Sequence, residues 1–209
     1  MHTVFLIGSI ASGKSTAARY LERCGAHRIE LDAVCKSLYV PGSELVAALS
    51  RAFGDDILDE AGAVRPRILA ARAFSDATST ARLESLVYPT LEERLRTLLA
   101  GLQQDTDAPS LVIVEVSAPK SFTDAFALAD EVLAITAPYE ERRARACARG
   151  MEAADFEARD ALQLDDAGLC ALATTVIENV GDDTALFDAL DAWLERTRPS
   201  LLSGGACCA

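Results

Sequence analysis

The stretch Thr3-Val-Phe-Leu-Ile-Gly8-Ser-Ile-Ala-Ser-Gly13-Lys14-Ser15-Thr16 decides the fold class. An apolar run typical of a buried strand leads directly into a G-x-x-x-x-G-K-S loop, and a helical pattern follows. Glycines at both ends of the loop let the backbone curl so that successive N–H groups point at phosphate oxygens. The positive end of the following helix strengthens that field. The sequence therefore predicts a loop that binds ATP or GTP.

The residues of this loop have distinct predicted contacts. We expect Lys14 to reach the β- and γ-phosphates and the Ser15 hydroxyl to bind Mg²⁺. The other residues expected at the nucleotide are Gly8, Ser9, Ala11, Ser12, Gly13 and Thr16. A glycine-containing turn without a ligand is the alternative, but it requires neither the strand before the loop nor the helix after it.

Composition excludes several classes of protein. The chain has 209 residues, of which half are apolar, so one mid-sized domain with inserted subdomains is expected. A net charge of −12 argues against a nucleic-acid partner. No stretch approaches the roughly 20 apolar residues that span a bilayer, and the N-terminus lacks the pattern of a secretion signal. We expect a cytoplasmic protein with a small-molecule substrate, no membrane partner, and a monomeric or weakly homo-oligomeric state.

Apolar, strand-like segments alternate with helical patterns along the chain. After the first strand they lie at residues 26–31, 111–116, 131–136 and 175–179, and a closing helix is predicted near 183–198. Strands separated by helices predict a parallel sheet with helices on both faces.

The segment between the second and third strands is too long for one crossover. It reads as helical, with breaks at Pro41-Gly42, at the loop 54–66 and at Pro89. We therefore predict a helical substrate-binding subdomain at 33–106. The predicted core comprises 1–32, 107–138 and 173–199, the lid region 139–172, and a disordered tail 200–209.

Asp32 follows the second predicted strand, at the edge where open α/β sheets bind their ligands. A carboxylate at this position can orient an attacking hydroxyl and accept its proton. The alternative is that Asp32 only caps the next helix. The position favours the catalytic interpretation.

Three arginines, Arg142, Arg145 and Arg149, share one face of a predicted helix that follows the fourth strand. Guanidinium groups bind phosphate oxygens in pairs and neutralise charge in phosphoryl transfer. We predict that this helix belongs to a lid over ATP. The alternative is a solvated helix face on which Glu141 pairs with Arg145.

Two further polar residues stand at strand ends. Asn179 follows the last strand, where its amide can both donate to and accept from adenine, although a turn-forming asparagine is the alternative. Glu115 ends the third strand, where a second acidic group near Mg²⁺ is expected. The alternative for Glu115 is a structural role as the polar end of a buried strand.

The order of these motifs resembles the dephospho-CoA kinase family over roughly residues 4–181. The residues that carry the resemblance are Gly8–Ser15, Ile29–Asp32, Pro41-Gly42, Phe53–Leu58, Asp59–Arg65, Leu69, Phe74, Leu83-Glu84, Tyr88-Pro89, Arg145, Arg149, Gln163 and Ile177–Asn179. So many motifs in one order are more specific than the loop alone.

The resemblance implies an α/β P-loop kinase: a three-layer fold with a parallel five-stranded sheet, a helical substrate subdomain and a lid. It implies transfer of the γ-phosphate of ATP to the 3′-hydroxyl of dephospho-CoA, which forms coenzyme A, with Mg²⁺ present. Asp32 then corresponds to the hydroxyl-orienting aspartate, and Arg145 and Arg149 to lid arginines. Substrate-binding residues are expected to be Asp32, Lys36, Arg65, Tyr88 and Glu115, with Arg67 as the alternative to Arg65 because the register near Gly62 slips by one.

The chain also departs from the family pattern. Tyr88 replaces a histidine before proline, 117–121 replaces an apolar segment, and Leu169 and Thr174 replace a lysine and an aspartate. The changes at 117–121 concern the acceptor more than the phosphates. Two alternatives are therefore a related kinase for a nucleoside, nucleotide or other small molecule, and a non-catalytic ATP-binding regulator. Lys14 together with Asp32 favours an enzyme.

Overall fold

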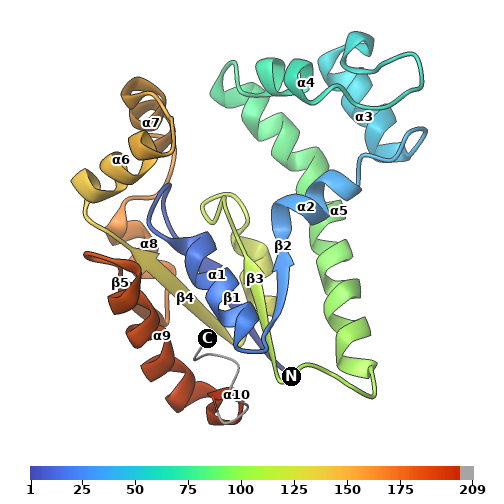
Figure 1. Ribbon diagram of the computed structural model, residues 1–209. Helices are drawn as coiled ribbons and strands as arrows, with labels where there is room; N and C mark the ends of the chain where they lie inside the picture. The colour runs from blue at the N-terminus through green and yellow to red at the C-terminus, as the bar shows by residue number, and fades with distance from the viewer. Residues whose placement is uncertain (203–209) are drawn as a thin grey trace. The chain divides into compact units, whose positions relative to one another are not determined.

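The computed structural model describes residues 1–202 and divides the chain into two compact units (Figure 1). The first unit comprises residues 1–31 and the chain from 102 onward, and the second comprises residues 32–101. We refer to them as the sheet unit and the helical unit. None of the described helices is long and apolar enough to cross a membrane.

The sheet unit contains five parallel strands in the order β2-β3-β1-β4-β5. The strands are β1 (His2–Ile7), β2 (His27–Glu30), β3 (Leu111–Glu115), β4 (Glu131–Thr136) and β5 (Thr175–Glu178). Every residue of β3 and all but the first of β1 are buried, which explains why they read as continuous apolar runs. The predicted fold class and all five predicted strands are confirmed.

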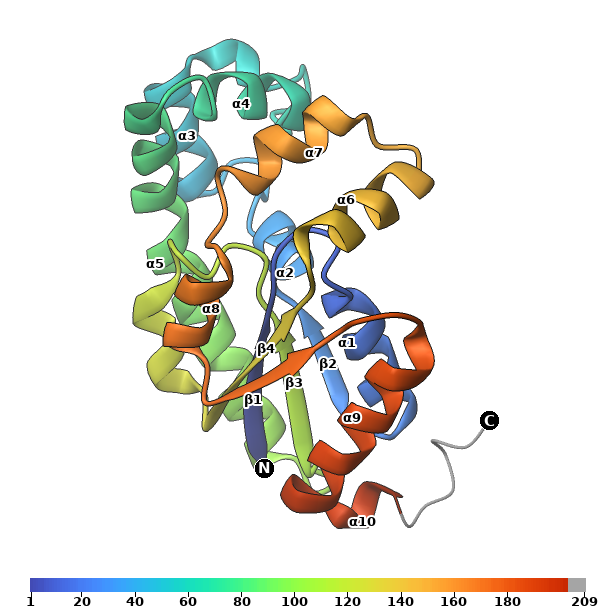
Figure 2. The ribbon, with the colours of Figure 1, turned by 90° about the vertical axis from the view of Figure 1, so that its left-hand side faces the viewer.

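Helices cover both faces of this sheet (Figure 2). On one face α1 (Lys14–Arg23) and α9 (Asp183–Thr197) pack with every second residue of the strands around the buried Trp193. On the other face lie η2 (Thr123–Leu128) and α8 (Asp166–Leu172). There the Phe5 and Phe126 rings meet edge to face at 5.4 Å.

The remaining helices of the sheet unit are α6 (Tyr139–Ala148), α7 (Ala153–Asp160) and α10 (Pro199–Leu202). Helices α6 and α7 lie in the predicted lid region, and they belong to the same compact unit as the sheet. Because residues 199–202 form α10, the predicted disordered tail starts too early. Its remainder, residues 203–209, lies outside the described residues.

The helical unit consists of α2 (Leu31–Ser37), α3 (Glu44–Phe53), η1 (Asp55–Ile57), α4 (Pro66–Ala73) and most of α5 (Ala77–Gln104). It has a core of its own, in which Leu49, Ile57 and Ala73 are fully buried. Its bounds, 32–101, are close to the predicted 33–106.

One predicted break is wrong. Helix α5 runs through Pro89 without interruption, although proline removes one backbone N–H and strains the preceding turn. Val87, Leu91, Leu95 and Leu99 are buried at helical spacing on both sides of the proline. We infer that burial of this row outweighs the local cost of the proline.

Candidate active site

The loop between β1 and α1 lies at the carboxyl edge of the sheet, after its central strand. Gly13 has φ of 102°, and a Cβ atom built on it would lie 2.2 Å from Nδ2 of Asn179. Glycine is therefore required at position 13 by both conformation and space. Ala11 also has a positive φ, of 61°, which is uncommon for a residue with a side chain and typical of functional loops.

The loop presents backbone donors where α1 begins. The N–H groups in the first turn of a helix have no partner within the helix. Gly13, the residue before α1, has no side chain that could cap them. The amides from Gly13 through Thr16 are thus suited to bind an anion, with the dipole of α1 behind them.

Lys14 and Ser15 both face the carboxyl end of β3. Lys14 Nζ donates to the Val116 carbonyl at 3.1 Å and to Ser117 Oγ at 2.9 Å. Ser15 Oγ donates to Glu115 Oε1 at 2.5 Å, and the same carboxylate oxygen lies 3.8 Å from Lys14 Nζ. The lysine, the hydroxyl and the carboxylate predicted at the phosphates and Mg²⁺ therefore form one cluster.

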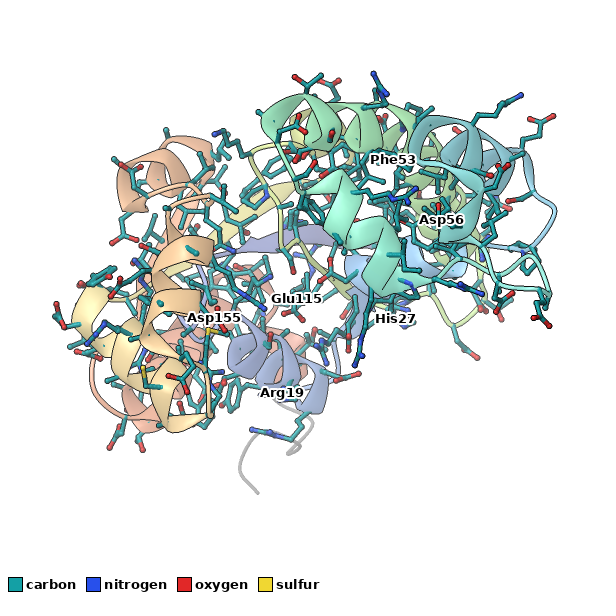
Figure 3. The ribbon with its side chains drawn as sticks, turned by 90° about the horizontal axis from the view of Figure 1, so that it is seen from above. Arg19, His27, Phe53, Asp56, Glu115 and Asp155 are labelled. Atoms are coloured by element: carbon teal, nitrogen blue, oxygen red, sulfur yellow. The ribbon has the colours of Figure 1, made fainter. Side chains whose placement is uncertain are left out.

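Glu115 is held from its other side by Arg28 of β2, a contact that sequence reasoning missed. Arg28 Nη2 donates to Glu115 Oε2 at 2.6 Å. Burial on its own raises the pKa of Glu115, but the hydrogen bonds from Ser15 and Arg28 and the charge of Lys14 outweigh it, so the pKa is lowered. Figure 3 labels Glu115, and Arg19 on the nearby helix α1. The sequence does contain one indication of a role for Arg28: it is a charged residue inside a short strand, one position before the buried Ile29.

Two serines predicted at the nucleotide have side chains that face the protein. Ser9 is 5% exposed and its Oγ donates to the Leu164 carbonyl at 3.2 Å, while Ser12 is fully buried. The loop turns both side chains inward, so the contact of Ser9 and Ser12 with the nucleotide, which stays a prediction, would be made by their backbone groups.

Gln163, which follows α7, is hydrogen-bonded to the loop between β1 and α1. Its Oε1 accepts a hydrogen bond from the Ile10 backbone N–H at 2.6 Å. Together with the contact between Ser9 and Leu164, this bond joins the end of the predicted lid region to the phosphate-binding loop. Sequence reasoning gave Gln163 no role, because nothing along the chain indicates that it meets a residue 153 positions away.

Arg142 does not belong to an open row of phosphate-binding arginines. It is 5% exposed, and its Nε donates to the Ala137 carbonyl at 3.0 Å while Nη1 donates to the Asp160 carboxylate. Nη1 also lies 3.5 Å from the Ile10 carbonyl. Its donors join α6 to the end of α7 and to the loop, and its contact with the nucleotide stays a prediction.

Arg145 and Arg149 have different surroundings from each other. Arg145 Nη2 donates to Glu141 at 2.8 Å and to the Asn179 and Gly181 carbonyls at 3.1 Å. The predicted alternative pair with Glu141 is therefore present. Arg149 is exposed, and its Nε donates to the Arg145 carbonyl of the same helix. Their role at the phosphates remains a prediction.

The side chain of Asn179 is hydrogen-bonded to the loop between β1 and α1. Its Nδ2 donates to the Ser12 carbonyl at 2.8 Å, and the residue is 2% exposed. The amide nitrogen therefore has a structural contact with the loop, and the contact of Asn179 with adenine stays a prediction. The amide fixes the turn that leads into Gly13.

The residues predicted at the acceptor lie mostly in the helical unit. Asp32 is in the first turn of α2, two residues after β2 ends, and Lys36 is in its last turn; both are exposed. Arg65 is exposed just before α4. Tyr88 of α5 is half-buried against the core of the unit, with its hydroxyl 3.4 Å from Glu84. Glu115 alone belongs to the sheet unit, where its contacts are with Ser15 and Arg28.

Comparison with known proteins agrees with this geometry. The family model for dephospho-CoA kinase matches residues 2–184. The chain belongs to the dephospho-CoA kinase family. The dephospho-CoA kinase of Ralstonia nicotianae is 35% identical over 91% of this chain and 96% of its own length. That of Corynebacterium diphtheriae is 34% identical over 89% of this chain and 92% of its own.

A solved structure supports the fold as well. The crystal structure of TT1252 from Thermus thermophilus has a TM-score of 0.73 and 30% identity, and covers 93% of this chain and 97% of its own. The family resemblance inferred from the loop and the ordered motifs is confirmed.

Proposed function

We propose that this chain transfers the γ-phosphate of ATP to the 3′-hydroxyl of dephospho-CoA and so forms coenzyme A. The observation that carries the proposal is the cluster of Lys14, Ser15 and Glu115 beside the loop amides, in a chain that belongs to the dephospho-CoA kinase family. Such a cluster suits a nucleoside triphosphate with a divalent cation.

The residues of the cluster fit Mg²⁺. A hydroxyl and a carboxylate oxygen lie 2.5 Å apart, and hard oxygen donors of this kind, few in number, are what Mg²⁺ binds next to substrate phosphates. Ser15 would hold the ion, with Glu115 behind it. When bound, Mg²⁺ supplies charge neutralisation at the phosphates.

The chain's own groups then have separate tasks. The amides from Gly13 to Thr16 bind the phosphates, and Lys14 leaves its contacts with Val116 and Ser117 to donate to them. Asp32 orients the acceptor hydroxyl and accepts its proton. Arg145 of α6 and Arg149, the residue that follows α6, neutralise charge on the transferred group. Lys36, Arg65 and Tyr88 contact the acceptor.

The first experiment measures ADP formation from Mg-ATP with and without dephospho-CoA, in the wild type and in Asp32→Asn. We expect strong stimulation by dephospho-CoA, and a loss of about 10²–10⁴-fold in Asp32→Asn because a positioned base is removed. Binding of ATP to the variant should be unchanged. Lys36→Met, which removes a charge from the same helix, is compared as the acceptor-binding variant and should raise KM for dephospho-CoA more than it lowers kcat.

Two other outcomes are informative. In the first, ADP formation does not respond to dephospho-CoA but is stimulated by another hydroxyl acceptor. That result would change the assigned substrate and leave the assignment as a kinase intact. ATP binding without turnover for every acceptor tried would indicate that the chain is a regulator.

We also propose that the protein acts in the cytoplasm.

A further inference from the structure

Arg28 lies at the centre of an acidic group inside the sheet unit. Its guanidinium is 2.6 Å from Glu115, 3.0 Å from Glu30 and 3.7 Å from Glu22. The side chains of Arg28 and Glu115 are only 12% and 9% exposed. An ion pair shielded from water in this way is costly to break on one side, because the remaining charge has no solvent to compensate it.

The strand register explains why a cation is needed here. Glu30 of β2 and Glu115 of β3 are directly paired neighbours in the sheet, and Arg28 stands two residues before Glu30 on the same face. Like charges at directly paired positions destabilise a sheet. Arg28 binds both carboxylates and removes that repulsion.

The nearest cation to Glu115 apart from Arg28 is the loop lysine. Lys14 Nζ lies 3.8 Å from Glu115 Oε1, beyond hydrogen-bond distance, and donates to Val116 and Ser117. Arg28 occupies the opposite oxygen, Oε2. If Arg28 is removed, the buried carboxylate has Lys14 as its only neighbouring cation in the described part of the sheet unit, and attraction at this distance is strong where water is excluded.

We propose that Arg28 is a positioning residue of the nucleotide site: by binding Oε2 of Glu115, it keeps the ion pair between Lys14 and that carboxylate long, at 3.8 Å, and so leaves the hydrogen-bond donors of the lysine to the phosphates. This inference rests on the proposed binding of ATP by the loop. Arg28 acts without touching the nucleotide, through Glu115.

The test is the affinity for ATP, measured by isothermal titration calorimetry. EDTA is present so that no divalent metal ion takes part in binding. We expect Arg28→Met to weaken ATP binding roughly 10-fold, the scale of one charged hydrogen bond. The double variant R28M/E115Q should recover affinity to within about 2-fold of the wild type, because the carboxylate that captures Lys14 is gone. Arg19→Met, which removes an exposed charge from α1, is the matched control and should bind like the wild type.

Rescue by a second substitution separates this role from a structural one. If Arg28 only stabilises the sheet, R28M/E115Q stays as weak as Arg28→Met or becomes weaker, and the inference is overturned. Unchanged affinity in Arg28→Met overturns it too. Should the methionine variant fail to fold, Arg28→Gln carries the test, because it keeps a donor to Glu115 but no charge, and wild-type affinity there overturns the inference. A wild type that does not bind ATP at all contradicts the proposed function instead.

Discussion

The two units of this protein hold their polar residues in opposite ways. In the sheet unit, Glu115 and Asn179 are buried and bound to the phosphate-binding loop or to its lysine and serine. In the helical unit, Asp32, Lys36 and Arg65 are exposed. Most of the groups proposed to bind the nucleotide are thus held in place by contacts within the protein, which favours electrostatic catalysis of phosphoryl transfer. The groups proposed to bind the acceptor are surface residues of a unit with its own core, so we expect that they can change without disturbing the loop.

The largest expected effect tests whether the two cores are independent. Leu49 is fully buried in the helical unit, and Leu49→Ala should destabilise that unit by about 2–5 kcal/mol. We expect turnover to fall while the Kd for ATP stays within roughly 2-fold, because Leu49 belongs to the core of the helical unit and the loop belongs to the sheet unit. Thermal unfolding and calorimetric ATP titration measure the two effects. Val40→Ala, at a position 56% exposed in the same unit, is the control. A parallel loss of ATP affinity would remove the contrast between the units.

A smaller effect should appear when the loop loses its support from the predicted lid region. Gln163→Leu leaves the Ile10 N–H without its acceptor, at a cost of about 1–2 kcal/mol, and should raise KM for ATP roughly 5- to 30-fold. The KM for dephospho-CoA should change much less. The neighbouring Leu162→Ala, at a position 77% exposed, serves as control. Equal changes in both KM values would mean that Gln163 supports the whole site rather than the loop.

The smallest effect concerns the end of the sheet remote from the loop, where Glu131 accepts hydrogen bonds from Trp193 at 2.9 Å and Thr175 at 2.7 Å and contacts His2 at 3.3 Å. Burial on its own raises the pKa of Glu131, but these contacts outweigh it and lower the pKa below its ordinary value. The ionised carboxylate therefore stabilises the fold above that ordinary value, and the contribution is lost as pH falls through the lowered pKa.

We expect Glu131→Gln to lower stability by about 1–2 kcal/mol at neutral pH, with the difference from the wild type shrinking below about pH 4. Unfolding curves recorded across pH measure this, with exposed Glu178→Gln on β5 as the control. His2 and Asp130 also lie at this end, 3.6 Å apart. A difference that grows in acid would contradict this role of Glu131. ATP affinity should not change in either variant.

Local sequence determined much of this protein. A phosphate-binding loop needs glycine and lysine at fixed spacing between a strand and a helix. This spacing was enough to predict such a loop at residues Gly8 to Thr16. Buried parallel strands must be apolar on both faces, which made β1, β3 and β4 visible as apolar runs. The position of Asp32 just after a strand and the order of motifs predicted the kinase family.

Tertiary structure alone decided which polar side chains meet. Arg28 reaches Glu115, Gln163 reaches Ile10 and Asn179 reaches Ser12 across 87, 153 and 167 residues of chain. Arg142 shares a helical face with Arg145 but is buried against Asp160. Spacing along a chain fixes which residues share a face, but what that face packs against depends on how distant segments come together. The sequence therefore predicted the groups that we propose bind phosphate, and only the fold revealed the side chains that hold them in place.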